Sequence, residues 1–309
     1  TCCFRCECMN KYFNILLFLV FLWLASYGIS FFFTDDTVVS GDQILVIPVE
    51  GMLTFQGEGS LLSSSTSGQD LAEYIRDANE DESVKGIVLE INSPGGTVMG
   101  SKVVVDALKE VDKPVVAVIT EYGTSGAYWV ASQADYIIAD DLSIVGSIGV
   151  LGSYLDFSGL LDDYNVSYQR LVTGKYKDIS TPYREMSSEE EILLMQRLNG
   201  IHDYFVEDVA EGRGMTFEDV FALADGLFYL GEDAVDIGLI DALGNKDDAI
   251  RITKELAGLS DGYVSEYEEE EDFWTQLSKD YLAYSSFYIG KGIGSVLFSV
   301  DAEQVALQV

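Results

Sequence analysis

The sequence predicts an α/β fold, because short apolar runs alternate with stretches of helical periodicity over most of its length. Residues 86–91 and 115–119 are rich in β-branched side chains, which is typical of strands buried on both faces of a parallel sheet. Each run is followed by a glycine-containing turn, at 92–96 and 121–123 respectively, and then by apolar residues at helical spacing. This repeated strand–turn–helix order is the main observation that favours the fold class.

The other elements follow in the same alternation. We expect strands at 44–49, 136–139 and 143–150, a strand-like segment at 168–172, and helices at 70–79, 98–111, 125–134 and 189–212. Residues 63–67 are serine and threonine, which predicts a flexible loop that could border a substrate groove. The acidic run 266–272 indicates a linker. The predicted organisation is therefore a globular domain at 42–256, followed by an acidic linker and C-terminal tail at 257–309.

An apolar segment at residues 12–33 precedes this domain. It carries no charge across 22 positions, which is long enough at about 1.5 Å per residue to cross a bilayer core of about 30 Å. Arg5 and Lys11 precede the segment and Asp35 and Asp36 follow it, so the N-terminus is expected in the cytoplasm and the domain outside the cell membrane. A cleaved secretory signal is the alternative. The length of the run and the lack of a small-x-small site favour an uncleaved transmembrane anchor at 9–36.

All cysteines of the chain lie before this anchor, at Cys2, Cys3, Cys6 and Cys8. Their spacing fits no standard zinc pattern, and no second ligand pair follows downstream. Met9-Asn10-Lys11 resembles a natural start, so we interpret residues 1–8 as an upstream extension, with palmitoylation near the membrane as the alternative. The sequence predicts no metal and no cofactor.

The net charge of −34 is extreme for a domain of this size. Such a surface disfavours nucleic acid and anionic lipid headgroups as partners. Two explanations stay open: a protein kept soluble in high salt, and a generally acidic extracellular protein.

Ser125 is the first candidate for chemistry, because it lies where a strand gives way to a helix. Unpaired N–H groups at a helix start can stabilise an oxyanion, although a serine there can also simply cap the helix. A second turn, Asn-Ser-Pro-Gly-Gly at 92–96, follows the neighbouring strand and could supply another N–H donor. A plain type II turn is its alternative.

A serine nucleophile needs a base. His202, the single histidine, borders the apolar stripe of the long helix, so we interpret it as a structural residue. Lys175 and Lys177 follow the strand-like segment at 168–172, and a lysine whose pKa is lowered can act as a base. Without further information, a solvated loop is the favoured interpretation of both lysines, because lysine side chains are mostly exposed.

Four motifs, taken in order, resemble the signal peptide peptidase A family, also called protease IV. They are Asn-Ser-Pro-Gly-Gly at 92–96, Thr-Ser-Gly-Ala-Tyr at 124–128, Val-Gly-Ser-Ile-Gly-Val at 145–150 and Gly-Lys-Tyr-Lys-Asp-Ile at 174–179. The resemblance covers about residues 44–256, in a single copy of the motif set. It implies the fold that the Clp proteolytic subunit shares with the crotonases, built from ββα units.

The resemblance also implies roles for five residues. Ser125 would be the nucleophile, Lys177 the general base, and Ser147 the serine that orients the lysine, while Gly96 and Gly126 would donate their N–H groups to the oxyanion. In this family the Ser–Lys dyad can be completed across a subunit boundary, which implies a homo-oligomer.

The implied function is a membrane-anchored serine endopeptidase that cleaves hydrophobic peptides such as remnant signal peptides. Its partners would be these peptides and, through the N-terminal helix, membrane lipid. Two alternatives stay open: a crotonase-like acyl-CoA enzyme and a non-catalytic membrane scaffold on the same fold.

Overall fold

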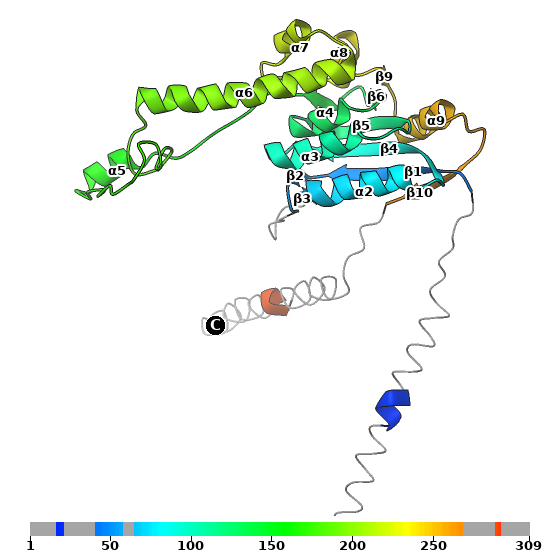
Figure 1. Ribbon diagram of the computed structural model, residues 1–309, viewed down its shortest axis with the longest axis horizontal. Helices are drawn as coiled ribbons and strands as arrows, with labels where there is room; N and C mark the ends of the chain where they lie inside the picture. Colours follow the sequence, from blue (N-terminus) through cyan, green and yellow to red (C-terminus); the bar gives the residue numbers. More distant parts are fainter. Residues whose placement is uncertain (1–16, 22–40, 58–64, 268–287, 292–309) are drawn as a thin grey trace, which may run out of the picture. The chain divides into compact units, whose positions relative to one another are not determined.

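A computed structural model describes residues 17–21, 41–57, 65–267 and 288–291 (Figure 1). The chain divides into two compact units, one before Gln43 and one from Gln43 onward, and each is considered by itself. In the first unit, residues 17–21 are helical, whereas the rest of the anchor predicted at 9–36 lies outside the described residues. No helix among the described residues is long and apolar enough to cross a membrane.

The second unit is built on a mixed, mainly parallel sheet. Its strands follow the order β10-β1-β4-β5-β6-β9, and every pair along this path is parallel. β7 pairs parallel with β5 and antiparallel with β8. The strands are β1 (Gln43–Glu50), β4 (Val84–Ser93), β5 (Val115–Thr124), β6 (Tyr136–Ala139), β7 (Ile144–Gly146), β8 (Phe228–Leu230), β9 (Ala242–Leu243) and β10 (Tyr263–Glu266).

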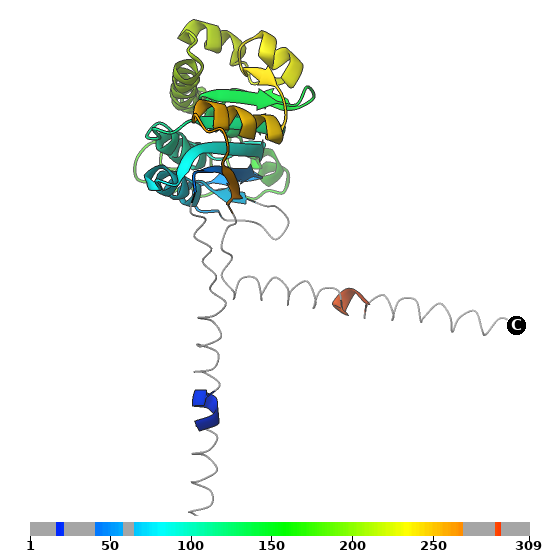
Figure 2. The ribbon, with the colours of Figure 1, turned by 90° about the vertical axis from the view of Figure 1, so that its right-hand side faces the viewer.

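Helices cover both faces of this sheet. Alternate side chains of the central strands enter two separate clusters: Ile87 and Leu89 join the larger one, and Val88 joins the smaller. The larger cluster includes residues of α2, α3, α4 and α6, and the smaller includes α9, which crosses the sheet in Figure 2. The helices are α2 (Gly68–Glu80), α3 (Val98–Leu108), α4 (Gly126–Ala131), α5 (Ser158–Asp163), α6 (Ser188–Arg213), α7 (Phe217–Leu223), α8 (Gly231–Asp236) and α9 (Lys246–Leu256). Burial on both faces explains why the central strands read as continuous apolar runs.

A small parallel sheet of β2 (Met52–Thr54) and β3 (Ser65–Ser67) fixes the glycine turn after β4. Leu53 donates its N–H to the carbonyl oxygen of Gly95 at 2.9 Å and accepts the N–H of Thr97 at 2.8 Å. A Cβ at Gly96 would lie 1.8 Å from the Leu53 carbonyl oxygen, so only glycine fits at this position beside β2.

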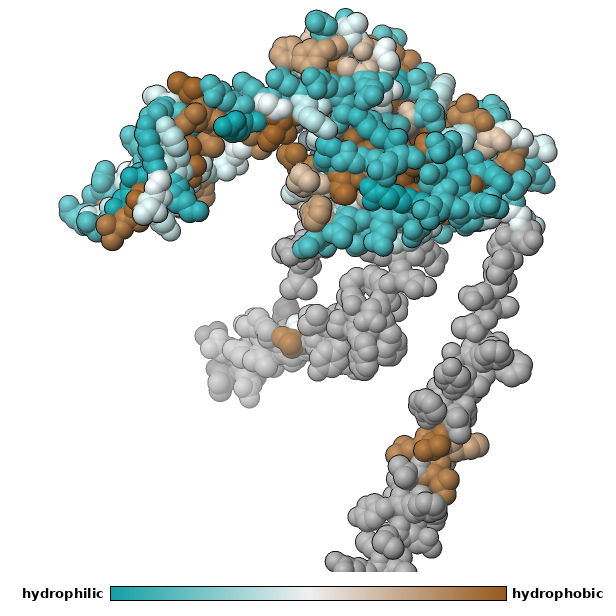
Figure 3. Space-filling model, viewed as in Figure 1, coloured by the Kyte–Doolittle hydropathy of each residue, from teal (hydrophilic) through white to brown (hydrophobic). Residues whose placement is uncertain are grey.

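We call residues 151–187 the arm. It includes α5, none of whose residues is buried, and it leads into α6 at the end away from the sheet (Figure 1). Apart from Glu190, the buried residues of α6 all lie in its last third, at 205–210. Figure 3 shows hydrophobic side chains on the arm and in the hollow beneath α6. The arm and the first half of α6 therefore carry apolar surface that the described part of the chain does not cover.

The α/β fold class is confirmed, and the central sheet fits a Clp protease/crotonase-like fold. The predicted turn at 121–123 is wrong, because β5 continues through Thr124 by pairing with β7. The strand predicted at 143–150 is only Ile144–Gly146, and 168–172 forms no strand because the arm offers it no partner strand. The loop predicted at 63–67 is wrong for Ser65–Ser67, which pair with β2, and Ser67 then caps α2.

Candidate active site

Ser125 occupies a strained position between β5 and α4. Its backbone has φ 52° and ψ −126°, a region that non-glycine residues adopt at a cost of about 1–3 kcal/mol and mainly at functional sites. Its N–H donates to the Gly146 carbonyl oxygen at 2.7 Å, and its carbonyl oxygen accepts the Trp129 N–H at 3.0 Å. The side chain makes no capping hydrogen bond, so capping does not explain this serine. A serine held on a sharp strand-to-helix turn is the arrangement of a nucleophile elbow.

The glycine turn after β4 lies against Ser125. Gly95 has φ +95°, and a Cβ there would meet the Ser125 Cβ at 2.9 Å and the Gly126 nitrogen at 2.7 Å. A Cβ at Gly126 would lie 3.4 Å from the Gly96 nitrogen. Neither the Gly96 N–H nor the Gly126 N–H donates a hydrogen bond to another described residue. Two unpaired N–H donors therefore lie beside the serine, as an oxyanion hole requires.

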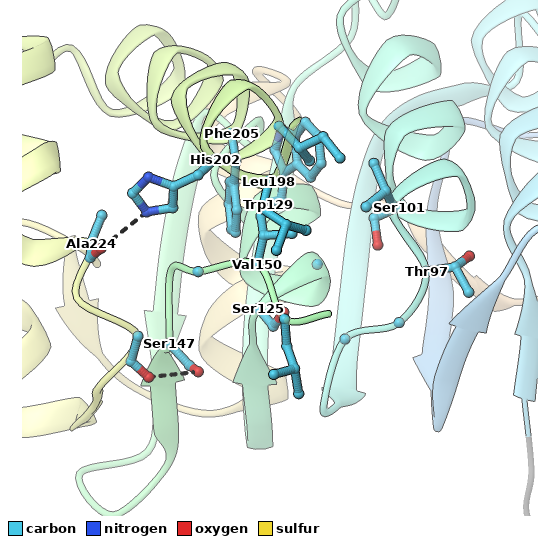
Figure 4. Close-up of a pocket in the computed structure, with 18 of the residues that line it drawn as sticks. Thr97, Ser101, Ser125, Trp129, Ser147, Val150, Leu198, His202, Phe205 and Ala224 are labelled. Carbon is cyan, nitrogen blue, oxygen red and sulfur yellow. Dashed lines mark hydrogen bonds between the residues drawn. The ribbon is translucent and has the colours of Figure 1, made fainter. Parts of the chain in front are cut away.

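Ser147 directly follows β7, the strand that pairs with the end of β5. Thr124 pairs with Gly146 across β5 and β7, so the two serines leave neighbouring strands at the same edge. Ser147 also has a positive φ, 50°, and its N–H donates to the Leu227 carbonyl oxygen at 2.9 Å. Its hydroxyl donates to the Gly226 carbonyl oxygen at 3.1 Å (Figure 4). Because this hydroxyl proton is already engaged, only the oxygen lone pairs can receive a further partner.

These residues line one cavity of about 820 Å³. Four of the five predicted site residues are among its lining: Gly96, Ser125, Gly126 and Ser147. An apolar part of the lining includes Val150, Trp129 of α4, and Leu198 and Phe205 of α6 (Figure 4). A reactive serine with free N–H donors therefore faces an apolar surface that suits hydrophobic side chains of a substrate.

Trp129 and its partner Asp208 belong to the site but were not predicted from the sequence. The indole ring of Trp129 stacks on Phe205 with centroids 4.8 Å apart, and its Nε1–H donates to Asp208 Oδ2 at 2.9 Å. Asp208 is buried and also accepts from Lys109 Nζ at 2.5 Å. Trp129 follows Ser125 by one helical turn, which was the available signal, whereas Asp208 is 79 residues away.

His202 has a structural partner. Its Nε2 lies 3.0 Å from the carbonyl oxygen of Ala224 and donates to it, because a carbonyl oxygen can only accept. The ring also meets Phe221 edge-on, with centroids 5.8 Å apart. The side chain lines the cavity but points toward Ala224 rather than Ser125 (Figure 4). This contact agrees with the interpretation of His202 as a structural residue.

Lys177, the fifth predicted residue, lies apart from the other four. It is exposed on the turn at 174–180 in the arm and does not line the cavity. Lys175 on the same turn donates to Glu189 Oε1 at 2.7 Å, and this hydrogen bond raises the pKa of the Lys175 amine. A raised pKa leaves less of the Lys175 amine in the neutral form that could accept a proton. Within one chain, the structure therefore assembles the serine and its donors but not the lysine.

No group of three or more His, Cys, Asp or Glu side chains that could hold a metal ion occurs in the described part of the chain. The cysteines at positions 2, 3, 6 and 8 lie outside it.

Comparison with known proteins identifies the family. Residues 107–260 match the model of peptidase family S49. The chain is 34% identical over 304 residues to a "Putative protease" of Methanocaldococcus jannaschii, covering 95% of this chain and 97% of that protein. It is 33% identical to "Putative signal peptide peptidase SppA" of Enterococcus faecium, covering 77% of this chain and 71% of that protein. It is also 33% identical to "Protease 4" of Salmonella typhi, with 75% of this chain and 37% of that protein covered. The chain therefore belongs to peptidase family S49 and is a serine peptidase.

Proposed function

We propose that this protein is a membrane-anchored endopeptidase that uses a Ser125–Lys177 dyad to cleave hydrophobic peptides such as remnant signal peptides. The observation that carries the proposal is the strained Ser125 beside two unpaired N–H groups, those of Gly96 and Gly126. This arrangement provides a nucleophile and an oxyanion hole before any substrate binds.

The reaction follows from these positions. Neutral Lys177 Nζ takes the Ser125 Oγ proton while Oγ attacks the carbonyl carbon of the peptide bond. The Gly96 and Gly126 N–H groups hold the resulting oxyanion. As the C–N bond breaks, the lysine returns the proton to the leaving amine. Water then hydrolyses the acyl-enzyme, giving one proton to the lysine, and Ser125 recovers its hydroxyl proton when the product acid leaves.

Ser147 fits a role beside the lysine. Its hydroxyl proton points to the Gly226 carbonyl oxygen, so its oxygen can accept a hydrogen bond from the lysine amine. Such a bond would orient the lone pair of Nζ toward Ser125 without supplying a competing proton.

The substrate class is inferred from the apolar wall of the cavity, formed by Trp129, Leu198 and Phe205. A relative that bears the name signal peptide peptidase supports the same class. Relatives named as proteases favour a peptidase over the crotonase-like and scaffold alternatives.

The location and assembly are also part of the proposal. The uncharged segment at 12–33 would anchor the chain in the cell membrane, with the N-terminus in the cytoplasm and the peptidase domain outside. A homo-oligomer is proposed because Lys177 lies outside the cavity and the arm that carries it exposes apolar surface. A second copy that covers the arm could bring Lys177 to the serine.

The test is a peptidase assay on the full-length protein in detergent. We expect Ser125→Ala to lower kcat at least about a thousandfold and Lys177→Ala to lower it about 10²–10⁴-fold. Lys175→Ala, on the same turn, is the matched control and should retain most activity. A fluorophosphonate probe should label the wild type and not Ser125→Ala. Near-normal turnover of Ser125→Ala or of Lys177→Ala would exclude the dyad.

A further inference from the structure

The turn that carries Lys177 is held by a network of four charged side chains. Arg170 binds the Asp178 carboxylate with two hydrogen bonds, Nε to Oδ2 at 2.6 Å and Nη2 to Oδ1 at 2.7 Å. Arg184 lies 3.4 Å from the same carboxylate and binds Glu190 with two bonds of 2.6 and 2.9 Å. The Asp178 and Glu190 side chains are only 15% and 7% exposed. The network thus ties the turn to the first turn of α6.

Lys177 differs from the charged side chains around it, because its amine has no partner within the described residues. The charged neighbours on its own turn and on the segments around it are Arg170, Lys175, Asp178, Arg184, Glu185, Glu189 and Glu190. Glu189 pairs with Lys175, and Glu190 and Asp178 pair with the two arginines. Within the described residues the Lys177 amine makes no hydrogen bond or ion pair. In a chain with 52 acidic residues and 18 basic ones, such a lysine needs an explanation.

An aspartate next to a catalytic lysine is a chemical problem. A carboxylate that pairs with an ammonium group favours the charged form of the lysine, which cannot accept a proton. Arg170 occupies both carboxylate oxygens of Asp178 in a bidentate geometry that a lysine cannot match. The hydrogen bonds from Arg170, supported by those from Arg184, hold the pKa of the Asp178 carboxyl well below its usual range. The carboxylate is thus strongly committed to the arginines.

We propose that Arg170 and Arg184 are positioning residues for the peptidase reaction: they sequester the Asp178 carboxylate, so that Lys177 arrives at the active site unpaired and on a fixed turn. The proposal rests on the proposed function in that Lys177 is taken as the base. It does not depend on whether Lys177 acts on its own chain or on a neighbour's.

The test compares pH profiles of kcat/KM for four full-length proteins: wild type, Arg170→Gln, Asp178→Asn and the double variant. In Arg170→Gln the Asp178 carboxylate is free to pair with Lys177, so the acid limb of the profile should move to higher pH by about one unit. Activity should recover at alkaline pH. Asp178→Asn should show no upward movement. In the double variant the limb should return to the position seen in Asp178→Asn. Arg197→Gln, which removes an exposed arginine of α6, is the matched control and should leave the limb unmoved.

A second measurement does not require activity. Only a neutral amine reacts with acetic anhydride, so the extent of Lys177 acetylation against pH can be followed by mass spectrometry in the Ser125→Ala background. We expect the midpoint to rise in Arg170→Gln and to return in the double variant. The inference would be overturned if Arg170→Gln lowered the maximal kcat/KM but left both the acid limb and the acetylation midpoint unmoved. It would also be overturned if the double variant kept the shifted limb or midpoint. Failure of the proposed function looks different, because Lys177→Ala would then retain turnover.

Discussion

At the scale of single residues, the candidate oxyanion hole depends on the absence of a side chain at Gly126. A Cβ there would meet Ser101 Oγ at 2.0 Å and Ser101 Cβ at 3.0 Å. Ser101 is 1% exposed, and its hydroxyl has no hydrogen-bond partner within the described residues. The contact between α3 and α4 is thus so close that a methyl group at residue 126 must displace either the Ser101 hydroxyl or the backbone that carries a proposed donor.

We therefore expect Gly126→Ala to lower kcat by about 10²–10³-fold, because the N–H remains but moves away from the oxyanion. Ser101→Ala alone should change the free energy of unfolding by less than about 1 kcal/mol, since its hydroxyl makes no bond that would be lost. The double variant should regain part of the activity, because a Cβ contact of 3.0 Å remains. Kinetics and denaturant unfolding of all three variants check this. Full activity in Gly126→Ala would contradict the close contact.

The sequence predicted the residues of the serine site better than their surroundings. Gly96, Ser125, Gly126 and Ser147 belong to local motifs, and the parallel sheet brings these turns to one edge. The bond from Trp129 to Asp208 depends on how α6 crosses α4, which no local pattern encodes. The separation of Lys177 from the cavity likewise depends on the path of the arm.

At the scale of elements, the long strands were predictable because burial on both faces makes them continuously apolar, as in β4 and β5. Short strands such as β2, β8 and β9 have two or three residues and gain their hydrogen bonds only from a tertiary neighbour. At 168–172 a strand was predicted and none forms. These residues have a β-like composition, but the arm contains no neighbouring strand with which they could pair. Pairing partners, rather than propensity, decided these cases.

The start of α6 provides a pH-dependent contact. Ser187 and Glu190 form a capping box, and Arg184, followed by Ser187, lowers the pKa of Glu190 from 4.5 to about 2. Because the folded value is the lower one, this contact stabilises the arm fully above about pH 4.5. The stabilisation is lost as the pH falls toward 2.

In the Ser125→Ala background, we expect pepsin to cleave residues 174–190 increasingly as the pH falls from 4.5 toward 2, while the central strands stay protected. Glu190→Gln should make this segment susceptible even at the upper end of that range. Glu191→Gln removes an exposed carboxylate one residue further along and is the control. Equal cleavage of wild type and Glu190→Gln at every pH would show that this contact does not hold the arm.

At the scale of the whole molecule, the arm carries apolar surface that the described residues leave uncovered. Leu171 is 99% exposed and Leu151 is 87% exposed, and Leu155 and Leu160 are also exposed. Monomeric proteins rarely leave so many large apolar side chains in water on one extended segment. The same segment carries Lys177 outside the cavity, so a single interface could both cover the arm and complete the dyad.

If Lys177 acts on the serine of a neighbouring copy, two inactive variants should restore each other. When Ser125→Ala and Lys177→Ala are co-expressed, each site of a randomly mixed ring takes its serine from one copy and its lysine from the next. Half of the copies carry an intact serine and the other half an intact lysine, so about one quarter of the sites are complete. About a quarter of the wild-type activity is therefore expected. Co-expression of Ser125→Ala with the Ser125→Ala/Lys177→Ala double variant should stay inactive. Adding Leu155→Asp to both partners should abolish the restored activity by charging the apolar surface of the arm, whereas Leu142→Asp, at an exposed leucine outside the arm, should not. Mixed oligomers that form and remain inactive would place each Lys177 on the serine of its own chain, because only then does mixing create no complete site.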